Sequence, residues 1–400
     1  MSSRHWNCYR DRQGLEILHG TSLLLYSCMD IDSDVSSDTL SESDDDSVVL
    51  PTVMTVGTIG QFCEVHKVYT DDTIQFGQMK TLVDFNDTQS LLYFRFKKDD
   101  ILILINAVWP RLRGYLQGQY DRLRVKNDYR CHFETALLIM LYRFLRPSRF
   151  RPEMEAFFGM RRAHLSASLF TITEAFENLA SKYLNNPSIF LNRIPYYAQR
   201  IEHKVELVDR VWGFIDGTLR KTCRPTYYQK HAYSGHKRCH GLKFQSVTTP
   251  DGLIACLWGP MNGNRHDSHM LRESNLLAQL RDMMTDIEPV YSLYGDPAYP
   301  QSMYIFGGYN NPAAGSPEAD WNTRMSKVRE AVEWGFKEIV NRWRFLDFRA
   351  SMKLFELPVA RYYTIGAFLC NIRSIFYENT TSAFFECDTL SLEEYLRLID

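Results

Sequence analysis

Short apolar runs separated by turn residues follow Pro195, and this pattern limits the fold more than any other feature of the chain. The runs that indicate strands are Val208 to Ile215, Lys243 to Thr249, Leu253 to Trp258 and Val290 to Tyr294. The stretches that indicate helices are Ser268 to Met284 and Trp321 to Trp343. Pro250-Asp251-Gly252 predicts a tight hairpin turn between the second and third runs. The resulting order, β-β-β-α-β-α, predicts a mixed α/β domain.

Residues 91–195 carry the spacing of helices instead. The predicted helices cover residues 101–108, Thr135 to Leu145, Met154 to Phe158 and a long stretch from Arg161. A short helix, a turn at Gly159 and a long helix follow the order of a helix-turn-helix, which would place Arg161 and Arg162 where DNA contacts lie. Ordinary packing of an all-α bundle also explains this order.

The first ninety residues show no sustained periodicity, and no fold is assigned to residues 1–90. Between Asp30 and Asp46 there are seven Asp and one Glu but no Lys or Arg, so the segment 30–47 is predicted to be disordered. Setting these eight acids aside turns the formal charge of −2 into +6 for the rest. The acidic segment is a solubilising spacer or, alternatively, an interaction tail that mimics the charge of DNA.

Membrane and secreted proteins are not indicated. The longest apolar stretches, such as Ile101 to Trp109, are too short to span a bilayer, and no secretion signal is evident. Nine cysteines occur singly, without a Cys-x-x-Cys pair, which argues against a disulfide framework and a zinc ribbon. We expect a soluble protein of a reducing compartment.

Two aspartates, Asp216 and Asp296, each follow a strand-like run. Phosphodiester chemistry with two metal ions needs acidic side chains that converge from different elements. If the two strands are parallel neighbours, both carboxylates lie at the carboxyl edge of the sheet, where sites form in α/β proteins. Each residue taken alone is also typical of an Asp that ends a strand and begins a turn.

A third carboxylate is expected on the helix from Trp321. Six apolar positions set the phase of this helix: Met325, Val328, Val332, Phe336, Ile339 and Trp343. Glu333 lies about 95° from the centre of this stripe, at the boundary between core and solvent, whereas Glu330 lies about 155° away. Glu333 is therefore the predicted ligand. The competing interpretation is an exposed ion pair between Glu333 and Lys337.

Asp267 directly precedes a predicted helix, within Asn264 to His269. Its ordinary role would be that of an N-cap. If the third strand runs parallel to the first, this loop could also reach the same sheet edge. Asp267 would then be an accessory metal ligand or a residue that orients the backbone.

A basic run with interleaved tyrosines follows Asp216. Its candidate DNA-binding residues are Lys230, His236, Lys237, Arg238 and Lys243. Such a run would bring positive charge to DNA phosphates beside the metals, and a merely solvated loop is the alternative. The same stretch contains residues that could form a zinc site, although their spacing matches no familiar motif: Cys223, His231, His236, Cys239 and His240.

Five ordered segments carry a family resemblance. They are Phe214 to Thr218, Tyr233 to Arg238 with Lys243 to Gln245, His266 to Ser268, Gly295 to Tyr299, and Arg329 to Phe336. Together they resemble the nuclease domain of PIF/Harbinger transposases and their domesticated relatives. The likeness covers about residues 208–377 and, more loosely, 385–396.

The resemblance implies an RNase H-like DDE nuclease domain over residues 205–378, followed by a C-terminal tail over 379–400. Asp216 and Asp296 would lie on adjacent strands and Glu333 on a following helix. These three acids would be catalytic and would hold Mg²⁺ or Mn²⁺, with Asp267 as the candidate fourth ligand. A metal-activated water would attack DNA, and the freed 3′-hydroxyl would attack target DNA.

The resemblance also implies partners. Double-stranded DNA, both transposon ends and target, would be the substrate, and relatives often work with a separate Myb-like DNA-binding protein. We expect a nuclear location, shared or not with the cytoplasm, and leave homo-oligomerisation open.

Two other functions are considered. A domesticated transposase-derived protein would keep the fold and bind DNA or a partner without cutting. A hydrolase acting on RNA or small phosphoesters is disfavoured by the ordered motifs.

Overall fold

The computed structural model describes residues 79–116, 122–124, 130–205, 210–297, 299–309 and 311–397, with two short strands nearer the N-terminus. The chain forms two compact units, Met1–Gly77 and Gln78–Asp400. In the first unit, β1 (Asn7–Arg10) pairs antiparallel with β2 (Glu16–His19). The acidic segment 30–47 lies outside the described residues, and its disorder stays a prediction.

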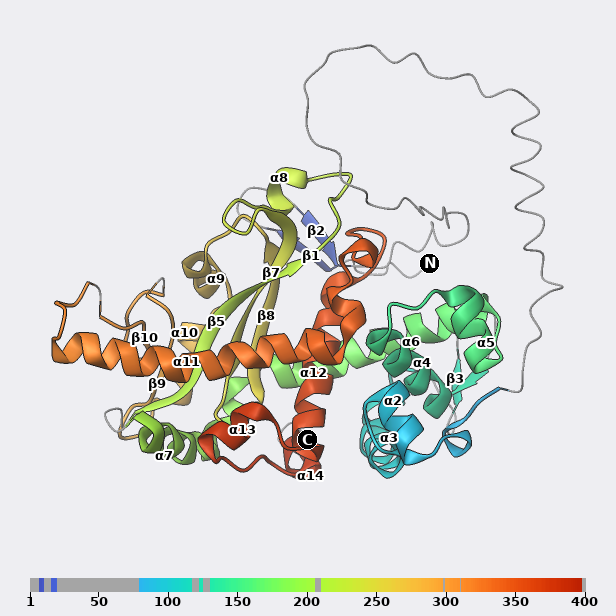
Figure 1. Ribbon diagram of the computed structural model, residues 1–400, viewed down its shortest axis with the longest axis horizontal. Helices are drawn as coiled ribbons and strands as arrows, with labels where there is room; N and C mark the ends of the chain where they lie inside the picture. The colour runs from blue at the N-terminus through green and yellow to red at the C-terminus, as the bar shows by residue number, and fades with distance from the viewer. Residues whose placement is uncertain are drawn as a thin grey trace, which may run out of the picture. The chain divides into compact units, whose positions relative to one another are not determined.

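A mixed six-stranded sheet forms the centre of the second unit (Figure 1). Its strands are β5 (Val211–Lys221), β6 (Tyr233–Ser234), β7 (Cys239–Thr248), β8 (Ile254–Asn262), β9 (Ser292–Tyr294) and β10 (Ile305–Phe306). β7 pairs antiparallel with β5, β6 and β8, whereas β9 runs parallel to both β5 and β10. The mixed α/β prediction is confirmed. A separate pair joins β3 (Arg122–Arg124) to β4 (Arg130–His132).

Several predicted boundaries are corrected. β5 continues to Lys221, so Asp216 lies within this strand and does not close it. β6 and β10 were not predicted, because two residues are too few to show an alternating pattern. The predicted helix Ser268 to Met284 is two helices, α9 (Asp267–Glu273) and α10 (Leu276–Met283). Asn275 between them adopts a left-handed backbone with φ of 55°, which ends the first helix.

Six helices form the first half of the second unit, in the part of the chain that the structure describes. They are α2 (Asp87–Phe94), α3 (Lys98–Leu112), α4 (Phe133–Leu145), α5 (Glu155–Phe158), α6 (Arg162–Leu184) and α7 (Ile194–Val205). Two of them, α6 and α7, pack against strands β8 and β5 of this sheet. Short 3₁₀ or π turns cover Leu82–Asp84, Phe150–Met154 and Pro187–Arg193. α6 packs against α4 and β8, so residues 91–195 and 205–378 belong to one compact unit.

The predicted short helix, glycine turn and long helix are confirmed at α5 and α6. Gly159 ends α5 with φ of 62°, a conformation that glycine adopts without strain. The buried Glu155 carboxylate accepts a hydrogen bond of 2.6 Å from the backbone N–H of Arg162 at the start of α6. Whether α6 reads DNA stays a prediction.

A long helix, α11 (Pro317–Arg342), crosses one face of the sheet (Figure 1). Ser316 caps its N-terminus by accepting a hydrogen bond from Ala319 N, and Pro317 occupies the first helical position. Its buried positions confirm the predicted apolar stripe: Met325, Val328, Phe336 and Ile339. The 3₁₀ turns η6 (Arg344–Asp347) and η7 (Arg349–Ser351) follow, and then α12 (Val359–Phe376).

The C-terminal segment packs into the core through α13 (Thr380–Phe385) and α14 (Leu392–Arg397). Asn371 on α12 donates to Ile254 O at 2.9 Å and accepts from Ile254 N at 2.8 Å. Asn379 donates to Asp251 O at 2.8 Å. Phe385 and Tyr395 are fully buried. Asn371 and Asn379 therefore hold the hairpin between β7 and β8.

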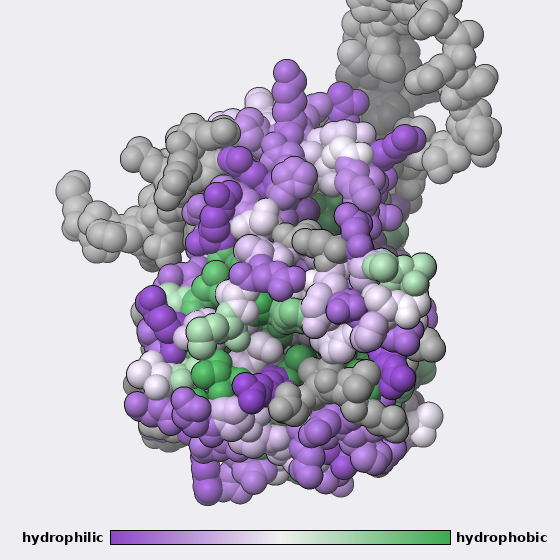
Figure 2. Space-filling model, turned by 90° about the vertical axis from the view of Figure 1, so that its left-hand side faces the viewer, coloured by the Kyte–Doolittle hydropathy of each residue, from purple (hydrophilic) through white to green (hydrophobic). Residues whose placement is uncertain are grey.

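The side of this unit that carries β10 and the start of α11 has a polar rim with apolar residues showing in its middle (Figure 2). Met303 and Tyr309, next to β10 in sequence, are both exposed.

No helix in the described part of the chain is long and apolar enough to cross a membrane. Its described cysteines are all free.

Candidate catalytic carboxylate site

The register of β5 and β9 brings Asp216 and Asp296 to the same level of the sheet. The two strands are parallel, and their last paired residues are Phe214 and Tyr294. Asp216 and Asp296 each follow that pair by two residues. Neighbouring strands lie about 4.8 Å apart and side chains alternate between faces, so both carboxyls are expected on the face of Phe214. This is the face that α11 covers, because Gly335 lies against Thr248, the partner of Phe214 on β7.

Asp216 is held in a partly buried position beside an arginine. Its carboxylate accepts a 2.8 Å hydrogen bond from the backbone N–H of Gly217. Oδ1 of Asp216 lies 3.6 Å from Nη2 of Arg329 on α11, and only 13% of the Asp216 side chain is exposed. Arg329 belongs to the segment Arg329 to Phe336 that carries the family resemblance, but its contact with Asp216 was not predicted. The guanidinium of Arg329 therefore stands next to this carboxylate.

Glu333 lies on α11 one helical turn after Arg329. Residues four apart lie on neighbouring parts of a helix surface, so the backbone of α11 brings position 333 near the sheet edge that Arg329 contacts. The side chains of Glu330 and Glu333 lie outside the described residues. The assignment of Glu333 as a ligand, and its alternative pairing with Lys337, stay predictions.

Tyr299 is a buried phenol among the charged groups of this site, and sequence analysis did not single it out. Its side chain is 2% exposed, and its hydroxyl has no hydrogen-bond partner among the described residues. Burial raises the pKa of Tyr299 well above its usual range, and the charges of Asp267, Asp216 and Asp296 raise it further, while Arg329 acts the other way. The Tyr299 phenol therefore lies within electrostatic range of three of the predicted acids.

Asp267 does not cap its helix, so the N-cap interpretation is wrong. His266 is the N-cap residue of α9, and Asp267 is the first helical residue. Its Oδ1 accepts a 2.9 Å hydrogen bond from Nζ of Lys243, a contact that also forms an ion pair. Its carboxylate lies against Gly217, where an added Cβ would be 2.8 Å from Oδ1. Adjacent strand residues point to opposite faces, so Asp267 lies behind β5 with respect to Asp216.

The basic run forms a hairpin with an exposed tip. His236, Lys237 and Arg238 are exposed in the turn between β6 and β7, and Lys230 is exposed on α8 (Gln229–Ala232). Lys243 differs, because its side chain is 17% exposed and engaged with Asp267. These four exposed residues stay candidates for DNA contact. Arg161 is exposed and Arg162 is half-buried at the start of α6, outside the sheet.

The zinc alternative is wrong. All five of its residues belong to the described part of the chain, where no three His, Cys, Asp or Glu residues come together as metal ligands. Cys223 instead directs its thiol to the carbonyls of Arg349 and Ala350, at 2.9 and 3.1 Å. Cys239 is buried in β7 while His236 is exposed in the preceding turn.

The residues around Asp216 suit a divalent cation by their chemistry. Carboxylate oxygens are the ligands that Mg²⁺ and Mn²⁺ prefer. Asp216 and Asp296 supply such oxygens from neighbouring parallel strands, and Tyr299 adds a buried hydroxyl without a partner among the described groups. The described side chains alone do not complete a three-ligand group, and position 333 on α11 is the predicted source of the third carboxylate.

Residues 215–371 match a family described as DDE superfamily endonuclease. The matched segment begins one residue before Asp216 and extends into α12, so it includes Asp296, Arg329 and Glu333. Searches of curated proteins and of solved structures returned no significant match. The matched part of the chain is thus similar to transposase-related endonucleases, which points to nuclease function and a DNA substrate.

Proposed function

We propose that this chain is a DDE transposase or endonuclease of the Harbinger type, which cuts and joins double-stranded DNA with two divalent metal ions. The observation that carries the proposal is the parallel register of β5 and β9, which sets Asp216 and Asp296 level within the segment similar to DDE endonucleases. A level pair of acids on adjacent strands is what a shared metal pair requires.

The strand order supports an RNase H-like fold for this segment. β5, β7 and β8 form an antiparallel meander, and β9 and β10 continue the sheet in parallel on the other side of β5. Parallel neighbours create a crevice at the carboxyl ends of their strands. α11 then crosses the Asp216 face, where a third acid from a helix would complete the set.

Each group near Asp216 has a role in this proposal. Asp216, Asp296 and Glu333 would hold the metal ions, whereas Asp267 lies on the other face of β5 and is paired with Lys243. Bound metal ions would lower the pKa of a water and stabilise the charge that develops on the phosphate. Arg329 would offset part of the charge of Asp216, and the exposed hairpin tip at residues 236–238 would meet DNA phosphates.

Calorimetric titration with Mn²⁺ tests the proposal. The wild-type chain is expected to bind Mn²⁺, and Asp216→Asn/Asp296→Asn is expected to lose that binding, because each substitution removes a ligand charge at nearly constant shape. Asp282→Asn/Asp286→Asn makes the same charge change at two exposed positions and should bind as wild type does. Absence of Mn²⁺ binding by wild type, even with DNA present, would favour the domesticated, non-cutting alternative.

A second pair of variants tests the helix position of the third acid. Glu333→Gln should abolish DNA cleavage, whereas Glu330→Gln, three residues earlier on α11, should retain most of it. Equal loss in both variants would mean that the assumed phase of α11 is wrong. We also propose that a Myb-like DNA-binding protein is a partner of this chain and that the chain acts in the nucleus.

A further inference from the structure

Two arginine-rich segments, far apart in the sequence, pack together at the end of α11. Residues 142–151 contain four arginines and no acid, and residues 341–349 contain three arginines and one acid. The end of α4 packs against η6. The guanidinium of Arg143 lies 4.0 Å from the ring centre of Phe345, which joins the two segments directly. The fold therefore concentrates positive charge here.

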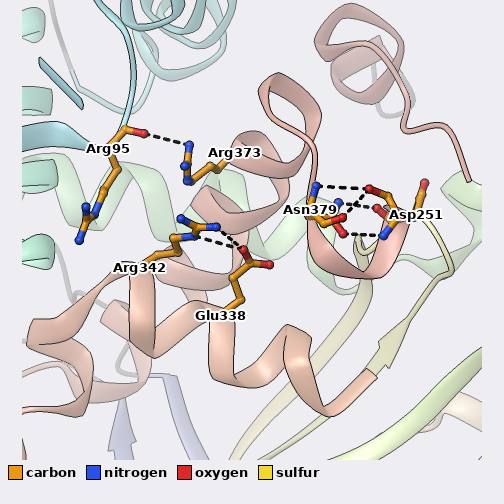
Figure 3. Close-up of polar contacts among 7 residues, drawn as sticks. Arg95, Asp251, Glu338, Arg342, Arg373 and Asn379 are labelled. Atoms are coloured by element: carbon orange, nitrogen blue, oxygen red, sulfur yellow. Dashed lines mark hydrogen bonds and ion pairs between the residues drawn. The ribbon is translucent and has the colours of Figure 1, made fainter. Parts of the chain in front are cut away.

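Five arginines from five elements make up what we call the arginine cluster: Arg95, Arg146, Arg342, Arg344 and Arg373. They come from the end of α2, the end of α4, the end of α11, η6 and α12. Figure 3 shows three of them, with Arg373 donating to the carbonyl of Arg95 at 3.1 Å. Arg344 is exposed, and the other four are half-buried.

Aromatic rings hold two members of the arginine cluster in place. The guanidinium of Arg146 lies 5.2 Å from the ring centre of Tyr93 and 5.6 Å from that of Tyr142. The guanidinium of Arg373 lies 4.3 Å from the ring centre of Tyr377. Stacked guanidinium groups keep their outer N–H donors available for an acceptor. The arginine cluster is therefore preorganised for a ligand that accepts hydrogen bonds.

Positive charge in the arginine cluster is poorly compensated. Within the described part of the chain, its one ion pair joins Arg342 to Glu338 on α11, at 2.7 Å (Figure 3). Burial lowers the pKa of Arg95, and repulsion from Arg344, Arg342 and Arg146 lowers it further. Burial likewise lowers the pKa of Arg373, with Arg342 as the next cause. The nearby Asp100 accepts a hydrogen bond from the hydroxyl of Tyr377.

We propose that the arginine cluster binds phosphates of the DNA backbone, at a place separate from the carboxylate site. This inference rests on the proposed function for the identity of the polyanion. Arginine presents several N–H donors in a plane that matches phosphate oxygens, and contacts to the DNA backbone depend on charge and position more than on sequence. Several arginines fixed on different elements suit successive phosphates better than a single small anion.

The arginine cluster lies well away from Asp216. Arg329 and Arg342 are thirteen residues apart on α11, which corresponds to about 20 Å along the helix axis. One phosphate cannot reach both positions. DNA held by the arginine cluster therefore adds affinity without entering the metal site, and metal binding and this contact are separable by mutation.

Fluorescence anisotropy with a labelled DNA duplex of arbitrary sequence, without metal, tests the inference in the full-length chain. Arg146→Gln/Arg344→Gln is expected to bind the duplex about tenfold more weakly than wild type. The slope of log affinity against log salt should become shallower by about 2, because two phosphate contacts are lost. Arg281→Gln/Arg397→Gln, which removes equal charge at positions 67% and 70% exposed, should change neither quantity to this extent.

The possible results separate this inference from the proposed function. Equal duplex binding and equal salt slopes for Arg146→Gln/Arg344→Gln and wild type would overturn the inference. Loss of binding to a poly-aspartate peptide by this variant, together with unchanged duplex binding, would also overturn the inference. The ligand of the arginine cluster would then be an acidic protein segment. Failure of the proposed function would give a different result. The wild-type chain would then neither bind Mn²⁺ nor cleave DNA, although its duplex binding would still depend on the arginine cluster.

Discussion

Two aspartates of the same sheet, Asp251 and Asp216, are surrounded in opposite ways. Asp251 is fully buried in the turn between β7 and β8 and is satisfied by neutral donors. Tyr197 Oη donates to it at 2.6 Å, Thr249 Oγ1 at 2.5 Å and Leu253 N at 3.2 Å. Asp216 is partly exposed and has a cation 3.6 Å away.

The difference separates an acid that builds the fold from one that is available for chemistry. Neutral hydrogen bonds that fill a buried carboxylate fix the turn around it and leave no position for a ligand. Desolvation by burial raises the pKa of Asp251, and its hydrogen bonds and the more distant charge of Arg193 lower it in part. At Asp216, by contrast, further acids and the unpartnered hydroxyl of Tyr299 share the neighbourhood. Acids beside a buried hydroxyl without a described partner are typical of a candidate functional site.

The largest expected effect is on activity at Asp216. Asp216→Asn should reduce Mn²⁺-dependent DNA cleavage by about a thousandfold, because losing a ligand charge removes several kcal/mol of metal-assisted stabilisation. Its midpoint of thermal unfolding should stay close to that of wild type. A variant that cuts normally would break the comparison, since Asp216 would then be a structural acid like Asp251.

The next effect is on stability at Asp251. Asp251→Ala leaves the hydroxyl of Tyr197 buried without its acceptor and removes one of the two acceptors of the Thr249 hydroxyl, which should lower the free energy of unfolding by about 3 kcal/mol. Urea unfolding would measure this change. Mn²⁺ binding by the folded fraction should be unaffected, and a loss of metal affinity equal to that of Asp216→Asn would contradict the division of roles.

A smaller effect is expected at Gly217, next to Asp216. In Gly217→Ala the new Cβ would approach Asp267 Oδ1 to 2.8 Å, so the carboxylate and its Lys243 partner must move. Overpacking of this kind costs about 1 to 3 kcal/mol of unfolding free energy. Gly235→Ala is the matched control, because an added Cβ there meets nothing within 4 Å. Equal stability of the two variants in urea would show that Asp267 is not held against β5.

The smallest stability effect belongs to Tyr299→Phe. Removing a buried hydroxyl without a described partner should leave the free energy of unfolding within about 1 kcal/mol of wild type. Cleavage should nevertheless fall about tenfold if this hydroxyl donates to a bound ligand, a loss of about 1.4 kcal/mol. If cleavage and stability are both unchanged, Tyr299 only packs in the core. The carboxylates alone would then make up the catalytic site.

The sequence allowed the general architecture to be predicted, because alternating and helical spacings extend over many residues. Long strands such as β7 and the buried stripe of α11 follow from those spacings. The two-residue strands β6 and β10 give no periodic signal, and a left-handed Asn275 divides a helix without any break in apolar spacing.

The sequence indicated which acids are candidates for the site, but it did not indicate which residues contact them. The pairing of Arg329 with Asp216 and of Lys243 with Asp267 depends on where α11 and α9 pack, which one-dimensional spacing does not specify. The orphan hydroxyl of Tyr299 is likewise a property of its surroundings, and a tyrosine in a turn carries no sequence signal for it. Glu333 was assigned by helix phase and by the family resemblance, and that assignment stays a prediction.

The bonds that Asn371 and Asn379 make to the β7–β8 hairpin have a consequence for biosynthesis. The backbone N–H and carbonyl of Ile254 bond to the side chain of Asn371, more than a hundred positions later. The carbonyl of Asp251 in the turn accepts a hydrogen bond from Asn379, which comes later still. A nascent chain that has just completed β8 therefore lacks these partners. Domains generally fold as units during synthesis, so we expect the sheet to be completed only after the residues up to Asn379 have left the ribosome.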